Sequence, residues 1–184
     1  MKKKMVKDLM VPLSEYATVS EEATLYDAIL ALEKAQAAFD QNRYRHRAVL
    51  VYDEKKKIVG KVSQLDILRA LEPKYDEMGI SSSFPRFGLG QRFQKAMLEQ
   101  LRLWNKPLND ICKRGGQIKI KEFMYTPAEG EYIPKNASMD QAINQLIMGH
   151  HQSLLVTGDN EITGILRLTD VFMEIVRVIK SCKT

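Results

Sequence analysis

At two places along this chain, the pattern of apolar and polar residues passes through the same succession of strand-like and helix-like spacings. Each place predicts a short strand, an amphipathic helix, two strands joined by a turn, and a second helix, because β-branched runs favour buried strands and helical spacing favours helices. At the first place we expect these elements at residues 15–19, 20–34, 48–51, 58–62 and 63–72. At the second place we expect them at residues 132–133, 134–148, 154–156, 162–166 and 168–180. Ser20 is expected to cap the first helix, and residues 35–45 are expected to extend it.

The two places are copies of one unit. The sequence K-D-L-M at 7–10 aligns with K-E-F-M at 121–124, an offset of 114, and G-K-V-S-Q-L-D at 60–66 aligns with G-I-L-R-L-T-D at 164–170, an offset of 104. Two copies of roughly 60 residues are too few for a solenoid, so they are expected to pack face to face about a pseudo-two-fold, with paired clefts between them. The expected organisation is a first repeat at 1–72, a connector at 73–117 and a second repeat at 118–184.

The connector has its own pattern. Residues 81–90 are rich in serine, glycine and proline and indicate a loop. An amphipathic helix is expected after it, on the apolar residues Phe93, Ala96, Met97, Leu101 and Trp104. That helix either packs over the core of its own chain or offers a docking face to a partner helix.

Composition narrows the class of protein. The 184 residues are 45% hydrophobic and 28% charged, which is typical of a globular protein with a real core. The net charge of +5 suits either phosphate-bearing ligands or an ordinary basic surface. Cys112 and Cys182 form no disulfide framework, so a reducing, cytoplasmic setting is expected. No stretch approaches the roughly 18 apolar residues that a membrane span needs.

The repeated motif carries the candidate chemistry. Ser63 stands where a strand is expected to turn into a helix, and Asp66 follows one turn later. A serine at such a corner can bind a phosphate oxygen beside free backbone N–H groups, and a carboxylate one turn on can accept ribose hydroxyls. The same S-x-x-D pattern is also a capping box that only stabilises the helix. Asp170 recurs in the second copy with Arg167 in place of the serine, so capping does not explain it there.

With these motifs the chain resembles a tandem pair of CBS domains, named for cystathionine β-synthase. The residues that carry the resemblance are V-K-D-L-M-V-P at 6–12, A-T-L-Y-D-A at 23–28, R-A-V-L-V-Y-D at 47–53, I-V-G-K-V-S-Q-L-D-I-L-R-A-L at 58–71 and, more loosely, E-I-T-G-I-L-R-L-T-D-V-F at 161–172. The resemblance implies an α/β (α+β) fold of two β-α-β-β-α repeats about a pseudo-two-fold. It also implies two clefts that bind adenine nucleotides as regulatory ligands, and modules that commonly pair, so a homodimer is expected.

The resemblance further implies a role for individual residues. Asp66 and Asp170 would hold ribose, and Ser63 would bind phosphate together with the basic pair His46 and Arg47. His151 holds the place of His46 in the second copy. The residues expected near adenine are Ala17, Val19, Tyr132 and Ile133, and Thr169 completes the second motif. Arg167 departs from the serine or threonine of the family, and it either binds phosphate or fills the second cleft.

No catalytic constellation, Walker A sequence or metal-ligand spacing is readable in the chain. We therefore expect a non-enzymatic regulatory module with no required cofactor, which binds an adenosine-containing nucleotide and acts on a regulated protein partner. The alternatives are a scaffolding subunit with degenerate clefts, an S-adenosylmethionine-binding module, and a nucleic-acid-binding protein. The last is least favoured, because the sequence offers neither an aromatic stacking platform nor a recognition helix.

Overall fold

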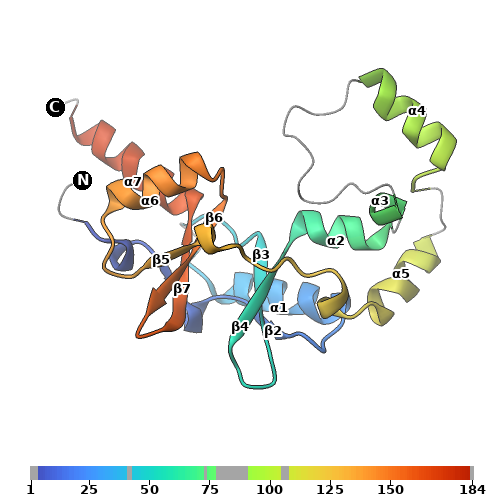
Figure 1. Cartoon of the computed structure of the whole chain (residues 1–184), viewed down its shortest axis with the longest axis horizontal. Helices are drawn as coiled ribbons and strands as arrows, with labels where there is room; N and C mark the ends of the chain where they lie inside the picture. Colours follow the sequence, from blue (N-terminus) through green and yellow to red (C-terminus); the bar gives the residue numbers. More distant parts are fainter. Residues whose placement is uncertain (1–3, 41–42, 73, 78–90, 105–107, 183–184) are drawn as a thin grey trace.

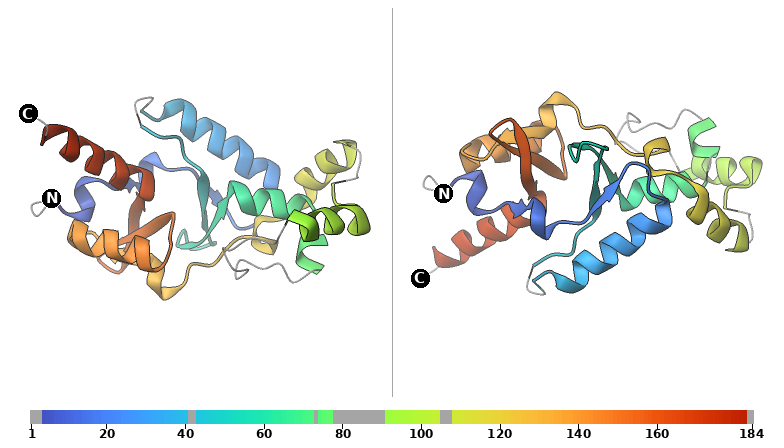
Figure 2. Two further views of the ribbon diagram at one scale, coloured as in Figure 1. Left: turned by 90° about the horizontal axis from the view of Figure 1, so that it is seen from above. Right: turned by 90° about the horizontal axis from the view of Figure 1, so that it is seen from below.

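The structure is a computed structural model that describes residues 4–40, 43–72, 74–77, 91–104 and 108–182. The strands are β1 (Val11–Pro12), β2 (Thr18–Ser20), β3 (Ala48–Tyr52), β4 (Ile58–Ser63), β5 (Tyr132–Pro134), β6 (Ser153–Gly158) and β7 (Glu161–Arg167). The helices are α1 (Leu25–Ala38), α2 (Gln64–Leu71), α3 (Lys74–Glu77), α4 (Gln91–Leu101), α5 (Leu108–Gln117), α6 (Met139–Met148) and α7 (Leu168–Ser181). The described chain termini lie at one end of the molecule and the connector helices α4 and α5 at the other (Figures 1 and 2).

Each repeat contributes a small mixed sheet. In the first, β2 runs parallel to β3, which forms a hairpin with β4; in the second, β5 runs parallel to β6, which forms a hairpin with β7. Helices α1 and α2 belong to the first repeat, and α6 and α7 to the second. The repeats thus follow the predicted β-α-β-β-α order, which confirms the expected fold class.

The segments that lead into the two repeats are exchanged. Strand β1, from the start of the chain, pairs with β7 of the second repeat through Val11 and Ile165, and Tyr125, ahead of the second repeat, pairs with Lys61 on β4. The offsets of 114 and 104 relate these two pairings exactly as they relate the motifs. Val6 is buried in the core of the second repeat, and Ile120 is buried in the core of the first. Each repeat therefore completes its core with a residue that precedes the other.

The motif glycines allow this exchange. A Cβ atom on Gly164 would lie 2.4 Å from the carbonyl oxygen of Val11, and one on Gly60 would lie 2.7 Å from the sulfur of Met124. Real Cβ atoms do not approach other atoms this closely, so Gly164 is needed for the close passage of the β1 backbone, and a side chain at Gly60 would require Met124 to shift.

The boundaries of α1 differ from the prediction. Thr24, not Ser20, caps the helix: its hydroxyl accepts a hydrogen bond from the backbone N–H of Asp27, whose carboxylate accepts one from the N–H of Thr24. This reciprocal pair satisfies two free N–H groups at once, whereas Ser20 lies in β2. The helix ends at Ala38, and residues 44–47 are not helical, so the expected extension to residue 45 was wrong.

The described part of the connector contains three helices, α3, α4 and α5. The predicted loop at 81–90 lies outside the described residues, and α4 falls where the amphipathic helix was expected. Helix α5 packs against α1 and α2, whereas α4 stands away from both sheets (Figure 1). The turn after α4 is held by buried Glu72, whose carboxylate accepts a hydrogen bond of 2.8 Å from the backbone N–H of Trp104. No helix within the described ranges has the length and apolar character to cross a membrane.

Candidate functional site

A cleft of about 680 Å³ lies between the two repeats, beside the start of α2. Residues of both repeats line this cleft. The lining residues are Tyr16, Arg45, Arg47, Ala48, Lys61, Ser63, Gln64, Leu65, Asp66, Tyr125, Glu131, Gly149, His150, His151, Gln152, Ser153, Arg167 and Thr169. The cleft therefore contains the first motif and approaches the second.

In the first motif, Ser63 and Asp66 form a capping box at the start of α2. The carboxylate oxygen Oδ2 of Asp66 accepts hydrogen bonds from the N–H of Ser63 at 2.8 Å and from its hydroxyl at 2.6 Å. The other oxygen, Oδ1, has within the described residues only a distant ion pair with Arg69, at 3.9 Å. The capping role and a ligand role are thus compatible, because capping leaves one oxygen able to accept hydrogen bonds from a ligand.

The floor of this cleft is a polar cluster of three residues, Lys61, Tyr125 and Glu131. The buried carboxylate of Glu131 is paired with the ammonium of Lys61 and accepts a hydrogen bond of 2.5 Å from the hydroxyl of Tyr125. Burial alone would raise the pKa of Glu131, but the hydrogen bonds from Lys61 and Tyr125 outweigh it and hold the pKa below its ordinary value. The hydrogen bond to Glu131 also raises the pKa of Tyr125 to about 12. Glu131 is therefore ionised and Tyr125 is a neutral donor near pH 7.

Two arginines supply positive charge to the wall. The guanidinium groups of Arg45 and Arg47 line the cleft, both residues are exposed, and neither group has a hydrogen-bond or ion-pair partner among the described residues. An unpaired guanidinium is well suited to bidentate contact with phosphate oxygens. The cleft thus combines a carboxylate with a free oxygen and two unpaired cations.

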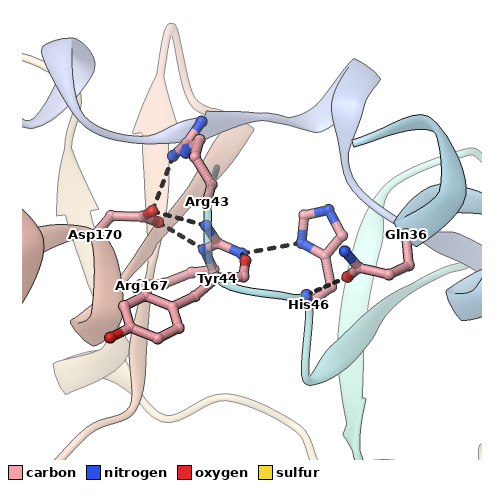
Figure 3. A network of polar contacts seen from close by, with 6 residues as sticks. All are labelled: Gln36, Arg43, Tyr44, His46, Arg167 and Asp170. Atoms are coloured by element: carbon pink, nitrogen blue, oxygen red, sulfur yellow. Dashed lines mark hydrogen bonds and ion pairs between the residues drawn. The ribbon is translucent and has the colours of Figure 1, made fainter. Parts of the chain in front are cut away.

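The second motif has a different environment (Figure 3). Arg167 donates from Nε to Oδ2 of Asp170 at 2.6 Å and from Nη2 to Oδ1 at 2.7 Å, which is a bidentate ion pair between buried side chains. Arg43 donates to the same Oδ1 at 3.0 Å. Both oxygens of Asp170 are therefore taken by protein groups. The ion pair with Arg167 also supplies the structural reason for an aspartate here, where capping does not.

His46, Phe39 and Tyr16 pack around this ion pair. The His46 ring lies 4.2 Å from the Phe39 ring and 4.5 Å from the Tyr16 ring, and its Nδ1 is 3.3 Å from Nη1 of Arg167. Phe39 lies beneath the guanidinium groups of Arg43 and Arg167, at 5.0 and 5.1 Å. Burial and the charge of Arg167 lower the pKa of His46 to about 4, and burial raises the pKa of Tyr16 to about 12. His46 is therefore neutral at pH 7.

The structure brings together only part of the predicted site. One cleft is lined by Arg47, Ser63, Asp66, His151, Arg167 and Thr169. His46, expected beside Ser63 and Asp66, packs against Arg167 instead. Of the residues expected near adenine, Val19 and Ile133 point into the two cores, Ala17 is buried in the first core, and Tyr132 is partly buried. The side chains of Ala17 and Val19 are buried in the first core, so for these two residues only the backbone groups remain candidates for contact with a ligand.

Sequence reasoning missed the polar floor of the cleft. Lys61 stands between apolar residues in a predicted strand, which was a readable sign that its side chain faces something polar. Glu131 stands at the offset of 114 from Ala17, so the repeat alignment already marked the position as different between the copies. Within the described part of the chain, no group of three or more His, Cys, Asp or Glu side chains could hold a metal ion.

The comparisons with known proteins agree with this architecture. The family model for the CBS domain matches residues 6–73 and 120–177. Comparison with curated proteins gave no significant match.

Solved structures share the fold at low sequence identity. A CBS domain-containing protein of unknown function from Bacillus anthracis str. Ames Ancestor is similar with a TM-score of 0.61 and 19% identity, over 96% of this chain and 95% of that one. CBSX2 in complex with AMP has a TM-score of 0.59 and 16% identity, over 95% and 97%. The CBS domain of the bacterial CNNM/CorC family Mg²⁺ transporter in complex with ATP has a TM-score of 0.58 and 18% identity, over 95% and 89%.

Proposed function

This chain belongs to the CBS-domain family, and on that premise we propose that it is a non-catalytic regulatory module whose Ser63–Asp66 cleft binds an adenine nucleotide. The observation that carries the proposal is the free Oδ1 of Asp66 in an open cleft that also holds unpaired guanidinium groups. The AMP and ATP complexes of CBSX2 and of the CNNM/CorC transporter domain support the class of ligand. The cytoplasmic location and the regulated protein partner expected from the sequence stay predictions.

In this proposal different residues bind different parts of the nucleotide. Asp66 accepts a ribose hydroxyl on Oδ1 while Oδ2 continues to cap α2. Arg45 and Arg47 bind phosphate oxygens, and the hydroxyl of Ser63 and the imidazole of His151 face the same space. S-adenosylmethionine is disfavoured, because its sulfonium charge would meet the same guanidinium groups without the phosphates that neutralise them.

Isothermal titration calorimetry with AMP, ADP and ATP tests the proposal. Asp66→Ala is expected to weaken binding by about 1–3 kcal/mol, the usual cost of losing the partner of a buried polar group. Asp140→Ala is the matched control, because Asp140 is exposed in the first turn of α6 and lies outside the cleft. Unchanged affinity in a folded Asp66→Ala protein, or the absence of binding by any of the three nucleotides, would refute the proposal.

We also propose that two copies of the chain pair through α2 and α7, which are equivalent helices of the two repeats. Leu65 and Leu68 on α2 are 55% and 51% exposed, and Phe172 and Ile179 on α7 are 54% and 56% exposed. Exposed apolar side chains of this size on both helices favour contact with a partner. Light scattering should give twice the chain mass of 21.1 kDa, and Leu68→Asp with Phe172→Asp should return it to the monomer mass. A monomeric wild-type protein at micromolar concentration would contradict the pairing.

A further inference from the structure

The connection before the central hairpin differs between the repeats. Residues 39–47 join α1 to β3, whereas residues 149–152 join α6 to β6. The described part of the longer connection sends Phe39, Arg43 and His46 against Arg167 and Asp170 of the other repeat. The shorter connection places Gly149, His151 and Gln152 along the cleft of Asp66, and Oδ1 of Asp66 keeps only its distant ion pair with Arg69 among the described residues. The two connections of different length therefore lie beside the two motif aspartates, whose contacts also differ.

These side chains satisfy the groups that a ligand would otherwise need to satisfy. Oδ1 of Asp170 accepts hydrogen bonds from Arg43 and Arg167, and Oδ2 accepts one from Arg167. Arg167 uses its remaining Nη1 toward the carbonyl oxygen of Tyr44, at 2.8 Å, and toward His46. The buried ring of Phe39 fills the space beneath the two guanidinium groups. Both carboxylate oxygens of Asp170 and all three guanidinium nitrogens of Arg167 are thus already paired within the chain, whereas Nε2 of His46 has no hydrogen-bond partner among the described residues.

We propose that Phe39 and Arg43 are an internal occupant of the second cleft, which they and Arg167 hold closed against a ligand. A buried guanidinium at the start of α7 is opposed by the positive end of the helix, and Asp170 supplies the anion that compensates it. Arg167 also lines the open cleft, but its guanidinium nitrogens are already engaged by Asp170, Tyr44 and His46, so the phosphate role weighed for it from the sequence would require breaking at least one of these contacts. This inference rests on the proposed function only where it says that the cleft would otherwise take a nucleotide.

The ligand-free protein provides the first test. Asp170→Asn is expected to lower Tm by on the order of 10 °C, because it leaves the buried Arg167 without its full counter-charge. The matched substitution Asp66→Asn, in the open cleft, is expected to lower Tm by only about 2–4 °C through the weakened cap. Equal effects of the two substitutions would overturn the proposal.

A milder pair keeps this test available if Asp170→Asn does not fold. Arg43 is 31% exposed and bonded to Asp170, whereas the guanidinium of Arg47 has no partner among the described residues. Arg43→Ala should lower Tm by about 2–4 °C and Arg47→Ala by less than about 1 °C. Indistinguishable melting curves for these two variants would also overturn the proposal.

Stoichiometry is the second test. Calorimetry with ATP should give one site per wild-type chain and two sites for the triple variant Phe39→Ala, Arg43→Ala, Arg167→Ser, which empties the cleft and restores the S-x-x-D motif. Two sites in the wild type, or one site in a folded triple variant, would overturn the internal occupant. If the wild type binds nothing and the triple variant binds one ATP, the internal occupant stands while the proposed function of the Ser63–Asp66 cleft fails.

Discussion

The two clefts are formed by equivalent elements of the two repeats, but the residues at their bases differ in polarity. In the open cleft the floor is Lys61, Tyr125 and Glu131, a buried ion pair with a phenol donor. At the offsets of 104 and 114 the equivalent positions are Ile165, Val11 and Ala17, all of them apolar and buried. Val11 and Ile165 pack with Phe39 in one hydrophobic cluster. The apolar base of the second cleft is therefore in the same cluster as the proposed internal occupant.

The comparison shows which features the repeat preserves and which it does not. The exchanged segments, the motif glycines and the motif aspartates occur in both copies, and they fix how the repeats pack. The side chains that face the clefts differ, and they decide whether Asp66 or Asp170 has an oxygen left for a ligand. The symmetry of the fold therefore does not extend to the side chains around Asp66 and Asp170.

The largest effect is expected from giving the open cleft the floor of the closed one. Lys61→Ile should cost about 3 kcal/mol of stability, because it leaves the carboxylate of Glu131 buried without its cation. Adding Glu131→Ala should recover most of this loss, because an ion pair replaced by apolar groups is nearly neutral. Urea denaturation of the single and double variants measures both changes.

The double variant is the informative one. A double variant that remains as destabilised as Lys61→Ile would show that the polar floor is needed for folding, and would break the comparison between the clefts.

The closed cleft should respond to acid through His46. The pKa of His46 is about 4 in the folded chain, against an ordinary value of 6.5 for histidine, so the unfolded chain binds more protons between these two pH values. The stability contributed by neutral His46 is therefore complete above pH 6.5 and is lost as the pH falls toward 4, by on the order of 2–3 kcal/mol. Arg167, Arg43, Asp170 and Tyr16 are the charged and titratable groups around the ring.

Melting curves at pH 7 and pH 4.5 check this prediction. His46→Gln keeps an acceptor for Arg167 but does not titrate, so its Tm should fall less between the two pH values than that of the wild type. The same fall in both proteins would mean that His46 is not the titrating group.

Substitution of the two motif glycines by alanine should give the smallest difference in stability between the repeats. Gly164→Ala should cost about 2–3 kcal/mol, because the new Cβ would meet the backbone oxygen of Val11 at 2.4 Å and β1 would have to move. Gly60→Ala should cost about 1–2 kcal/mol, because its closest contact is the flexible side chain of Met124 at 2.7 Å, although the carbonyl oxygen of Tyr125 follows at 3.2 Å. Urea denaturation ranks the two, and a larger loss for Gly60→Ala would contradict the tighter exchange at β1.

The sequence predicted the fold well because its signals are local. Hairpins, the cap at Ser63 and the position of α7 follow from patterns within a few residues, and the repeat offsets relate the two copies. Thr24 and Asp27 have the same spacing as Ser63 and Asp66, so the true start of α1 was readable in the same way.

The site was harder to predict because it depends on the path of one long connection. Nothing local in residues 39–47 shows that His46 and Arg43 reach the other repeat, since that requires the relative placement of two sheets. The Arg167–Asp170 pair was within reach, because residues three apart face each other at the start of a helix. Its partner Arg43, 127 residues away, was not.

A crystal structure of the protein with ATP would test the central claim most directly. The account predicts one nucleotide per chain, in the cleft of Ser63 and Asp66, with its ribose on Oδ1 of Asp66 and its phosphates toward Arg45 and Arg47. It also predicts that the bonds from Arg43 and Arg167 to Asp170 remain in place. A nucleotide with its ribose on Asp170, and Arg43 and Phe39 displaced from the second cleft, would contradict it.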